Sequence, residues 1–476
     1  MPISLRAVTG ALSGLVAAAG LSACTVAGGA EGEPGTATVT VGYQSKTINT
    51  VTAGTLLRER GFLEKRLAEV GDYQVRWADY DTGAPITAQM LAGKIDIGSM
   101  GDYPLLINGS RAGTGDCGTT LIAVTGWNPR GALNGVVVGA DSPVSTLEDL
   151  EGKSISASVG SAGHGTLVQA LDRAGIDPET AVSVENQDPG VGASALQAGS
   201  VDAVAQFVAW PGYLAWRDDA RLVYDGGELG VPTLHGTIVR NDVAREEPEV
   251  VQAFLKAQLD ATRYLHENPV EAARIVAEET GLPPEVVYLY NGRGGVSSFD
   301  PTIKDEQVEA LTQDVPFLRS IGVVERALDV DAFVDDTALR EAYGDSYDRD
   351  AASTANPAPI EGRDRTCGRK VTDPATAGEL WVQGEDDTRP AADPTCLVRA
   401  VAELDDGERL RAAYLPDAQT GTRWFADRML WLRDGEELLP FATEQSRSEY
   451  AADNPGASEL TWDQAVATQA GGGGAS

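Results

Sequence analysis

Apolar residues follow two alternating periods along residues 37–133. The every-second-residue pattern of a strand occurs in TATVTVGY (36–43), YQVRWADY (73–80), IDIGSMG (95–101) and LIAVTGW (121–127). The three-to-four-residue spacing of a helix occurs between them, in TLLRERGFLEKRLAEV (55–70) and ITAQMLAG (86–93). Strands alternating with helices predict βαβ units and a parallel sheet.

Residues 134–240 repeat this alternation. Strands are predicted in SISASVGS (154–161), AVSVEN (181–186) and VDAVAQFV (201–208), with helices in HGTLVQALDRAG (164–175) and GASALQAG (192–199). Two flanking β-rich segments, NGVVVGA (134–140) and HGTIVRND (235–242), fit strands that cross between two lobes. Residues 243–345 are mostly helical in pattern. We therefore expect one lobe from 37–133 plus 241–345 and a second from 134–240.

The remaining chain has a different character. Residues 346–365 lack periodicity and are rich in Asp, Ala and Pro, which predicts a linker. Residues 366–470 contain four Trp and predict a small α+β domain, and the Gly-rich end at 471–476 predicts a disordered tail.

Composition limits the partners of the chain. The 476 residues include 37 Lys plus Arg and 71 Asp plus Glu, so the formal charge is −34. A polyphosphate would be repelled, which argues against nucleic acid as a ligand. Hydrophobic residues make up 42% of the chain, too many for a disordered protein.

The first residues have the pattern of an export signal. Arg6 precedes an apolar run, Ala11–Gly20, which is too short to span a bilayer. Leu21-Ser22-Ala23-Cys24 then resembles a bacterial lipobox, in which Cys24 becomes the lipidated first residue of the mature protein. The alternative is an ordinary signal peptide with an incidental Cys. The lipobox predicts a signal peptide at 1–23, a flexible tether at 24–36 and a lipid-anchored protein on the extracytoplasmic face of the cell membrane.

Cysteine and histidine are scarce in the rest of the chain. Cys117, Cys367 and Cys396 remain after the predicted cleavage, and the histidines are His164, His235 and His266. No CxxC or Cys/His metal spacing occurs, so we expect neither a metal site nor metallohydrolase chemistry.

Parallel sheets bind ligands at the carboxyl ends of their strands, which selects a few loops. In GSAGHGT (160–166), the glycines and the following helix N-terminus suit a sulfonate, nitrate, carboxylate or phosphate. The same loop is equally compatible with a plain tight turn. Ser161 and His164 are better explained as a capping and a pocket residue than as a nucleophile pair. Trp127, Trp210 and Tyr213 fit either a pocket or a core, and Asp102 either a helix cap or a contact to an amine or hydroxyl.

Three runs in residues 37–345 resemble the nitrate/taurine/sulfonate family of ABC-transporter solute-binding proteins. They are LAGKIDIGSMGDYP (91–104), TLEDLEGKSISASVGSAGHGTL (146–167) and ALQAGSVDAVAQF (195–207). The resemblance implies a two-lobed type II periplasmic-binding fold that captures a small solute and passes it to a permease driven by an ATPase. It implies no catalytic residue and no cofactor. The implied ligand-binding residues are Tyr43, Gln44, Gly101, Asp102, Trp127, Ser161, His164, Gln206 and Trp210.

Residues 366–470 are similar to the NosL-like copper-chaperone family, through TCGRKVTDP (366–374), DPTCLVRAVAEL (393–404) and AAYLPDAQTGTRWFADRMLWL (412–432). That family's Cys-Gly-Met motif is here Cys367-Gly368-Arg369, so a cation replaces a soft Cu(I) ligand. We expect a structural Cys367–Cys396 disulfide instead. A copper-handling chaperone remains the alternative function. A third is an exported enzyme on the same fold, such as a pyrimidine-precursor synthase, whose Cys-rich run is missing here.

Overall fold

The computed structural model of the chain describes residues 37–113, 115 and 118–470. The predicted signal peptide, Cys24, the tether, Cys117 and the predicted tail lie outside the described residues. In the described part of the chain, no helix is both long enough and apolar enough to cross a membrane.

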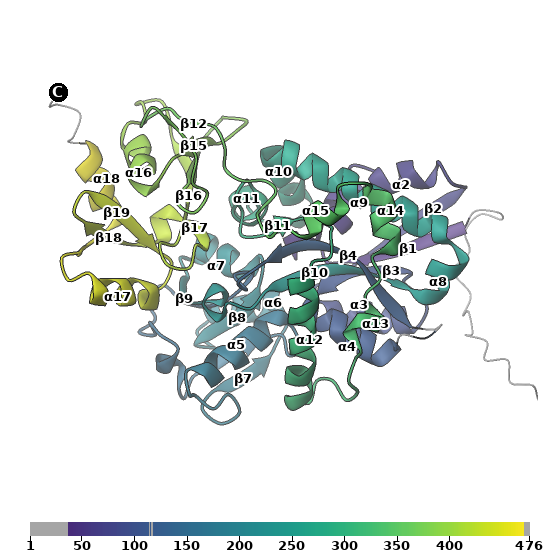
Figure 1. The fold of residues 1–476 in the computed structure, drawn as a ribbon. Helices are drawn as coiled ribbons and strands as arrows, with labels where there is room; N and C mark the ends of the chain where they lie inside the picture. Colours follow the sequence, from purple (N-terminus) through teal and green to yellow (C-terminus); the bar gives the residue numbers. More distant parts are fainter. Residues whose placement is uncertain (1–36, 114, 116–117, 471–476) are drawn as a thin grey trace, which may run out of the picture.

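The first lobe is built on a six-stranded sheet in the order β11-β4-β10-β3-β1-β2 (Figure 1). Its strands are β1 Ala37–Tyr43, β2 Tyr73–Asp79, β3 Ile97–Gly101, β4 Thr119–Asn128, β10 Thr233–Arg240 and β11 Ser298–Phe299. β1 pairs in parallel with β2 and β3, as the βαβ pattern predicts. β10 runs antiparallel between β3 and β4.

Helices cover this sheet on both faces. Along the chain they are η1 Ile48–Ala53, α1 Thr55–Glu59, α2 Phe62–Leu67, α3 Gly83–Leu91, α4 Asp102–Ala112, α8 Asn241–Glu246, α9 Pro248–Glu267, α10 Pro269–Thr280, α11 Pro284–Asn291, α12 Asp305–Ser320, α13 Val330–Phe333 and α14 Thr337–Tyr343. The single helix predicted at 55–70 is divided, because Gly61 adopts a left-handed conformation (φ 61°) between α1 and α2. The long helix α9 buries one apolar face, including Val250, Phe254 and Leu265, in the core of this lobe and its border.

The second lobe has a five-stranded sheet in the order β7-β6-β8-β5-β9. Its elements are β5 Asn134–Val138, η2 Glu148–Leu150, β6 Ser154–Ala157, α5 Ala162–Arg173, β7 Ser183–Asn186, α6 Pro189–Gln197, β8 Ala203–Phe207, α7 Trp210–Asp218, β9 Arg221–Asp225 and η3 Gly226–Leu229. β6 pairs in parallel with β7 and β8, while β5 and β9 are antiparallel additions.

The chain crosses between the two sheets in segments 129–133 and 226–232, which differ from the crossing strands predicted at 134–140 and 235–242. β5 lies wholly in the second sheet. β10 lies wholly in the first, so the prediction that assigned residues up to 240 to the second lobe is wrong. The cause is hydrogen bonding: β10 is bonded to β3 on one side and to β4 on the other.

The predicted linker at 346–365 packs against the rest of the protein. It contains α15 Tyr347–Ala351, and the buried Tyr347 hydroxyl bonds to Asp336 and to the amide of Ile303. Farther on, Ile360 is also buried. Two isolated apolar anchors hold this segment without producing a periodic pattern in its sequence.

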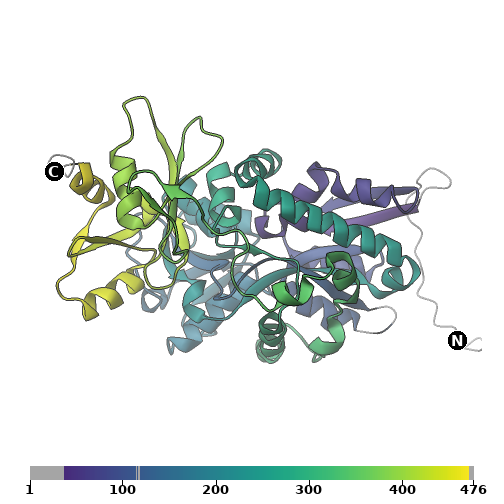
Figure 2. The ribbon, with the colours of Figure 1, turned by 45° about the horizontal axis from the view of Figure 1, so that its top comes forward.

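Residues 363–470 form an α+β domain with sheets in the orders β12-β13, β15-β14-β16-β17 and β19-β18-β20. Its elements are β12 Arg363–Asp364, β13 Arg369–Lys370, β14 Gly378–Val382, β15 Arg389–Ala391, α16 Pro394–Ala402, β16 Leu410–Pro416, β17 Arg423–Phe425, η4 Ala426–Arg428, β18 Leu430–Asp434, β19 Glu437–Phe441, α17 Glu444–Asp453, β20 Ser458–Leu460 and α18 Trp462–Ala470. Figure 2 shows this domain, yellow-green, at one end of the molecule.

A buried charge network joins the C-terminal domain to α11 of the first lobe. Glu379 on β14 is 1% exposed and accepts from the Arg423 guanidinium at 2.9 Å and from the Tyr288 hydroxyl at 2.9 Å. The Thr388 hydroxyl also donates to Glu379, at 2.7 Å. Every oxygen of this buried carboxylate therefore has a partner from a neighbouring element.

The same domain also contacts the second lobe. The Trp216 ring on α7 lies 5.2 Å from Phe425, centroid to centroid, and Arg428 pairs with Asp219. Apolar residues of both lobes and of the C-terminal domain form one continuous buried cluster. The domain is thus seated against both lobes rather than suspended from one of them.

We expect Arg423→Met to lower the free energy of unfolding by about 3–5 kcal/mol, because it leaves the buried Glu379 charge without its main partner. Arg263→Met removes an exposed ion pair with Asp260 and should cost at most about 1 kcal/mol. Denaturant unfolding followed by tryptophan fluorescence measures both. Equal, small losses in the two variants would contradict the role assigned to the network.

Candidate functional site

A cavity of about 570 Å³ lies between the two lobes. Its first-lobe wall includes Gln44, Thr82, Gly83, Gly101, Ile107 and His235, and its second-lobe wall includes Ser158, Gly160, Ser161, Ala162, Asp188 and Phe207. Most of these residues follow or end β1, β2 and β3 on one side and β6, β7 and β8 on the other, while Ile107 lies on α4 and His235 on β10. The carboxyl ends of the parallel strands thus face each other across one space.

Among the helices that begin at this cavity are α3 from the first lobe and α5 from the second. α3 starts at Gly83, and its N-cap Thr82 forms no side-chain capping bond. α5 starts at Ala162, and the hydroxyl of its N-cap Ser161 accepts from the amide of His164. The other first-turn amides of a helix have no intrahelical partner and carry partial positive charge. The cavity therefore offers backbone donors to an anion from both walls.

His235 on β10 supplies a neutral side chain to the first-lobe wall. The Asn49 side-chain amide donates to its Nδ1, so the proton of the neutral ring belongs on Nε2. Burial lowers the pKa of His235 to about 3. The ring fits because residue 101 is glycine: a Cβ at Gly101 would lie 2.9 Å from Nε2.

The rest of the wall combines apolar surface with few charges. Ile107, Phe207 and Val323 supply apolar side chains. Arg111 and Asp188 are the charged residues among those lining the cavity in the described part of the chain. Such a wall suits a small solute with one polar end and a short apolar remainder.

Of the nine ligand-binding residues expected from the sequence, Gln44, Gly101 and Ser161 line the cavity. The Nε2 of Gln44 donates to the Thr47 hydroxyl at 3.1 Å. Its side-chain carbonyl oxygen is buried and has no hydrogen-bond partner within the described residues.

Tyr43, Asp102 and Trp127 do not line the cavity. Tyr43 is the last residue of β1, and its hydroxyl accepts from Arg58 at 2.6 Å, away from the cavity. The Asp102 carboxylate accepts hydrogen bonds from the amides of Tyr103 and Leu234, so its role is structural. Trp127 is 1% exposed in the first-lobe core, so the expectation of a cleft-lining ring is wrong for this structure.

His164, Gln206 and Trp210 are also outside the wall. Gln206 donates to the Ser158 hydroxyl at 3.2 Å and so positions a residue that does line the cavity. Trp210 packs edge-to-face on Tyr213 within the core. The His164 Nδ1 accepts from the amide of Gly160 at 3.5 Å, and burial lowers the pKa of His164.

Sequence reasoning missed Thr82, Gly83 and His235. The first two follow the second predicted strand, so the strand-end rule that selected the other loops would have found them. His235 carries no comparable signal, because its role depends on β10 being inserted between β3 and β4.

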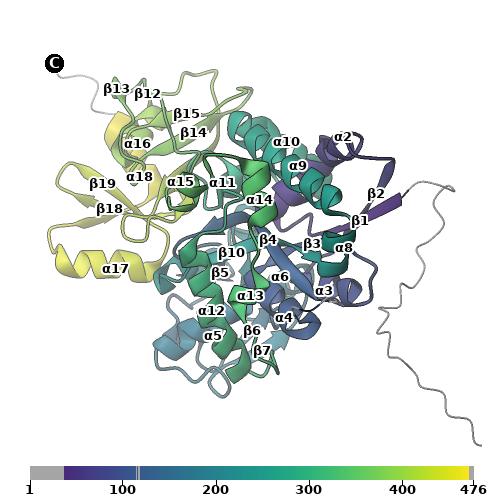
Figure 3. The same cartoon turned by 45° about the vertical axis from the view of Figure 1, so that its right-hand side comes forward.

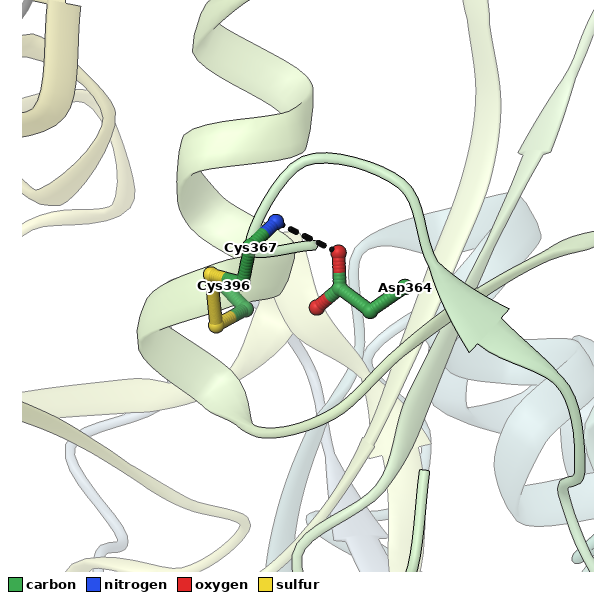
Figure 4. Close-up of side chains that lie close together, drawn as sticks. All are labelled: Asp364, Cys367 and Cys396. Atoms are coloured by element: carbon green, nitrogen blue, oxygen red, sulfur yellow. Dashed lines mark hydrogen bonds between the residues drawn. A yellow bond between two sulfur atoms is a disulfide. The ribbon is translucent and has the colours of Figure 1, made fainter. Parts of the chain in front are cut away.

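The C-terminal domain contains a disulfide between Cys367 and Cys396, the pairing expected from the sequence (Figure 4). Asp364 lies beside it, and its oxygens accept from the amides of Cys367 and Ala392. The three side chains bring potential metal ligands within 4.8 Å of one another. Both sulfurs are bound in the disulfide, so neither is present as the thiolate that a metal would bind. The NosL-like resemblance stays a prediction.

Comparisons with known proteins agree with the two-lobed geometry. The family model described as NMT1/THI5 like matches residues 108–272. The taurine-binding periplasmic protein of Escherichia coli is 30% identical over 235 residues, which are 48% of this chain and 70% of that protein.

Two solved structures share the fold. The alkanesulfonate-binding protein SsuA from Xanthomonas axonopodis pv. citri, bound to MOPS, superposes with a TM-score of 0.55 at 22% identity, covering 63% of this chain and 98% of that one. The periplasmic aliphatic sulphonate binding protein SsuA from Escherichia coli gives a TM-score of 0.53 at 21% identity over 63% of this chain and 92% of that one. The shared fold thus covers about two thirds of this chain and nearly all of each of those two chains. The chain belongs to the family of extracytoplasmic solute-binding proteins that includes the taurine-binding periplasmic protein.

Proposed function

We propose that this protein captures a small organic anion of the sulfonate class between its lobes and delivers it to the permease of an ABC importer, whose ATPase drives uptake. The observation that carries the proposal is the pair of helix N-termini, α3 from one lobe and α5 from the other, at one cavity. The names of the relatives support the choice of solute class.

The chemistry of the wall suits a sulfonate. Three sulfonate oxygens can accept from the first-turn amides of α3 and α5, where the helix dipoles favour negative charge. Nε2–H of His235 adds a neutral donor, and Ile107, Phe207 and Val323 can cover the aliphatic part. A solute that contacts both walls favours the arrangement in which the lobes are closed, because its binding energy differs between the two states.

The proposal includes a lipid anchor at Cys24. A protein that feeds a permease gains from being held at the same membrane, since tethering raises the effective concentration of the partners. We propose that residues 24–36 act as the tether between the lipid and β1.

Ala162→Asp tests the anion site directly. Ala162 is 6% exposed at the start of α5, and a carboxylate there would compete with a bound anion. Like charges about 4 Å apart near a protein surface repel by ~4 kcal/mol, so we expect hexanesulfonate or taurine to bind at least about 100-fold more weakly by calorimetry. Helix N-termini tolerate Asp well, so the fold should persist.

Ser200→Asp is the matched control, because it adds the same charge to an exposed residue of the same lobe outside the cavity. It should bind as the wild type does. Wild-type affinity in Ala162→Asp would exclude the α5 N-terminus as the anion site, and a wild type that binds neither solute would exclude this sulfonate class.

A second prediction concerns the protonation of His235. We expect its ring signals in NMR spectra to remain constant between about pH 8 and about pH 5, because its pKa is about 3, whereas an exposed imidazole titrates near 6.5. His235→Gln identifies the signal among the three histidines. A titration near pH 6.5 would show an imidazolium and refute the neutral-donor role.

The anchor has its own test. In an exporting bacterial host, Cys24→Ala should abolish lipidation, and the mature protein should leave the membrane fraction. Cys117→Ala serves as the control and should remain with the membranes. Membrane retention of Cys24→Ala would place the anchor elsewhere.

A further inference from the structure

Tyr103 joins the two lobes behind the cavity without lining it. It lies on α4 of the first lobe and is 4% exposed. Its ring rests directly on Gly165 of α5 in the second lobe: a Cβ at Gly165 would lie 1.9 Å from Cε2 and 2.4 Å from Cζ of Tyr103. The ring therefore occupies the space that any side chain at position 165 would need.

The nearest atoms at Gly165 all belong to the opposite lobe, which sets this glycine apart from its neighbour. A Cβ at Gly163 would instead meet the backbone of Gln206 and Phe207 within its own lobe. Gly163 thus serves packing inside the second lobe. Gly165 serves the contact between the lobes.

A hydrogen bond fixes the same contact. Nε2 of Gln169, one turn beyond Gly165 on α5, donates to the Tyr103 hydroxyl at 2.7 Å. The Tyr103 ring also lies 6.0 Å from that of Phe317 on α12, centroid to centroid. Figure 3 shows α12 beside α4, at the border between the lobes.

Asp314 of α12 completes the arrangement. Its carboxyl is buried close to the Tyr103 hydroxyl and to the carboxyl of Asp102 on α4, and both of these groups act on its pKa. Burial, and next the Asp102 charge, raise the pKa of Asp314 well above its usual range. Burial raises the pKa of Asp102 as well.

The other elements packed on α12 bring no compensating charge to Asp314 in the described structure. β10 contributes the amide of Leu234, which donates to Asp102, and the buried, neutral His235. α13 carries Asp331, which is exposed. Burial and the Asp102 charge raise the pKa of Asp314, and the Tyr103 phenol lowers it by less, so the surroundings favour the protonated form of Asp314.

We propose that Tyr103, Gly165, Gln169 and Asp314 form a latch between the lobes, and that closing this latch takes up a proton at Asp314, so that solute affinity depends on pH. These are positioning residues, since none of them lines the cavity. The inference rests on the proposed function in one respect: the lobes must open and close around a solute. Opening would lift Tyr103 from Gly165 and admit water to Asp314, which could then ionise.

The direction of the pH effect follows from linkage. A carboxyl whose pKa is raised in the closed state binds its proton more tightly there than in the open state. Closure is therefore favoured at low pH, and the advantage is lost as the pH rises toward the raised pKa. One proton taken up per closure allows at most a tenfold loss of affinity per pH unit.

Gly165→Ala tests the latch. The added methyl group would collide with the Tyr103 ring, so we expect hexanesulfonate to bind at least about tenfold more weakly and to cause less compaction in small-angle scattering. The control is Gly190→Ala in α6 of the same lobe, where the added Cβ meets only the Trp210 ring at 3.7 Å. It should behave as the wild type. Tyr103→Ala added to Gly165→Ala removes the collision and should restore the compaction, which a loss of folding alone would not allow.

Asp314→Asn tests the proton. Hexanesulfonate has no ionisable group in the range from about pH 6 to about pH 8.5, so the wild-type affinity should fall several-fold with rising pH, while the affinity of Asp314→Asn should change much less. A wild-type affinity independent of pH would overturn the proton step. Wild-type binding and compaction by Gly165→Ala would overturn the latch itself.

Failure of the proposed function gives a different result. If the wild type does not bind hexanesulfonate, hydrogen exchange of the α4 and α5 amides in the free protein still reports on the latch. At about pH 8.5, and after correction for the intrinsic pH dependence, these amides should exchange faster in the wild type than in Asp314→Asn if the latch exists. Equal exchange rates in the two proteins would refute the latch.

Discussion

The two lobes are held together where their crossing segments meet backbone to backbone. A Cβ at Gly226 would lie 2.4 Å from the carbonyl oxygen of Gly131, so neither lobe could keep its present position with a side chain there. The Asn128 carboxamide oxygen accepts from three successive amides, 130 to 132, and shapes the first crossing. Asp225 accepts from the amide of Gly227 and shapes the second. This close approach fixes which strand ends face each other and thus where the cavity lies.

The C-terminal domain is built onto this junction. Glu228, in the second crossing, bonds with the Thr443 hydroxyl of that domain, while Trp216 and α11 contact it from the two lobes. A change in the angle between the lobes must therefore move contacts that the C-terminal domain makes. The C-terminal domain is therefore joined to the lobes by packing as well as by the chain, because its apolar core is continuous with theirs. Its buried Glu379–Arg423 pair also contacts α11 of the first lobe through Tyr288.

The sequence predicted what short-range periodicity controls and missed what long-range pairing controls. The alternation of strands and helices in both lobes was visible, and so was the strand-end rule that found Gln44, Gly101 and Ser161. The position of β10 was not, because a strand with the same pattern can pair with either sheet. Trp127 and Trp210 were ambiguous for a related reason: an aromatic residue near a strand end faces the core or the cavity according to the register of its neighbours, which a single sequence does not reveal.

Binding an anion to a chain with a formal charge of −34 requires local donors that outweigh an unfavourable overall field. Screening limits that field to about 10 Å at 0.1 M salt, so the groups close to the cavity determine whether an anion is attracted or repelled. The groups near the cavity include several that attract an anion. The helix N-termini supply partial positive charge, and His235 supplies a donor without a titration near neutral pH. Burial and the Asp102 charge favour the neutral form of Asp314, which removes the repulsion that a second carboxylate beside Asp102 would exert. Under the proposed function and latch, the protonation of Asp314 would both lower the negative charge between the lobes and make their contact sensitive to pH.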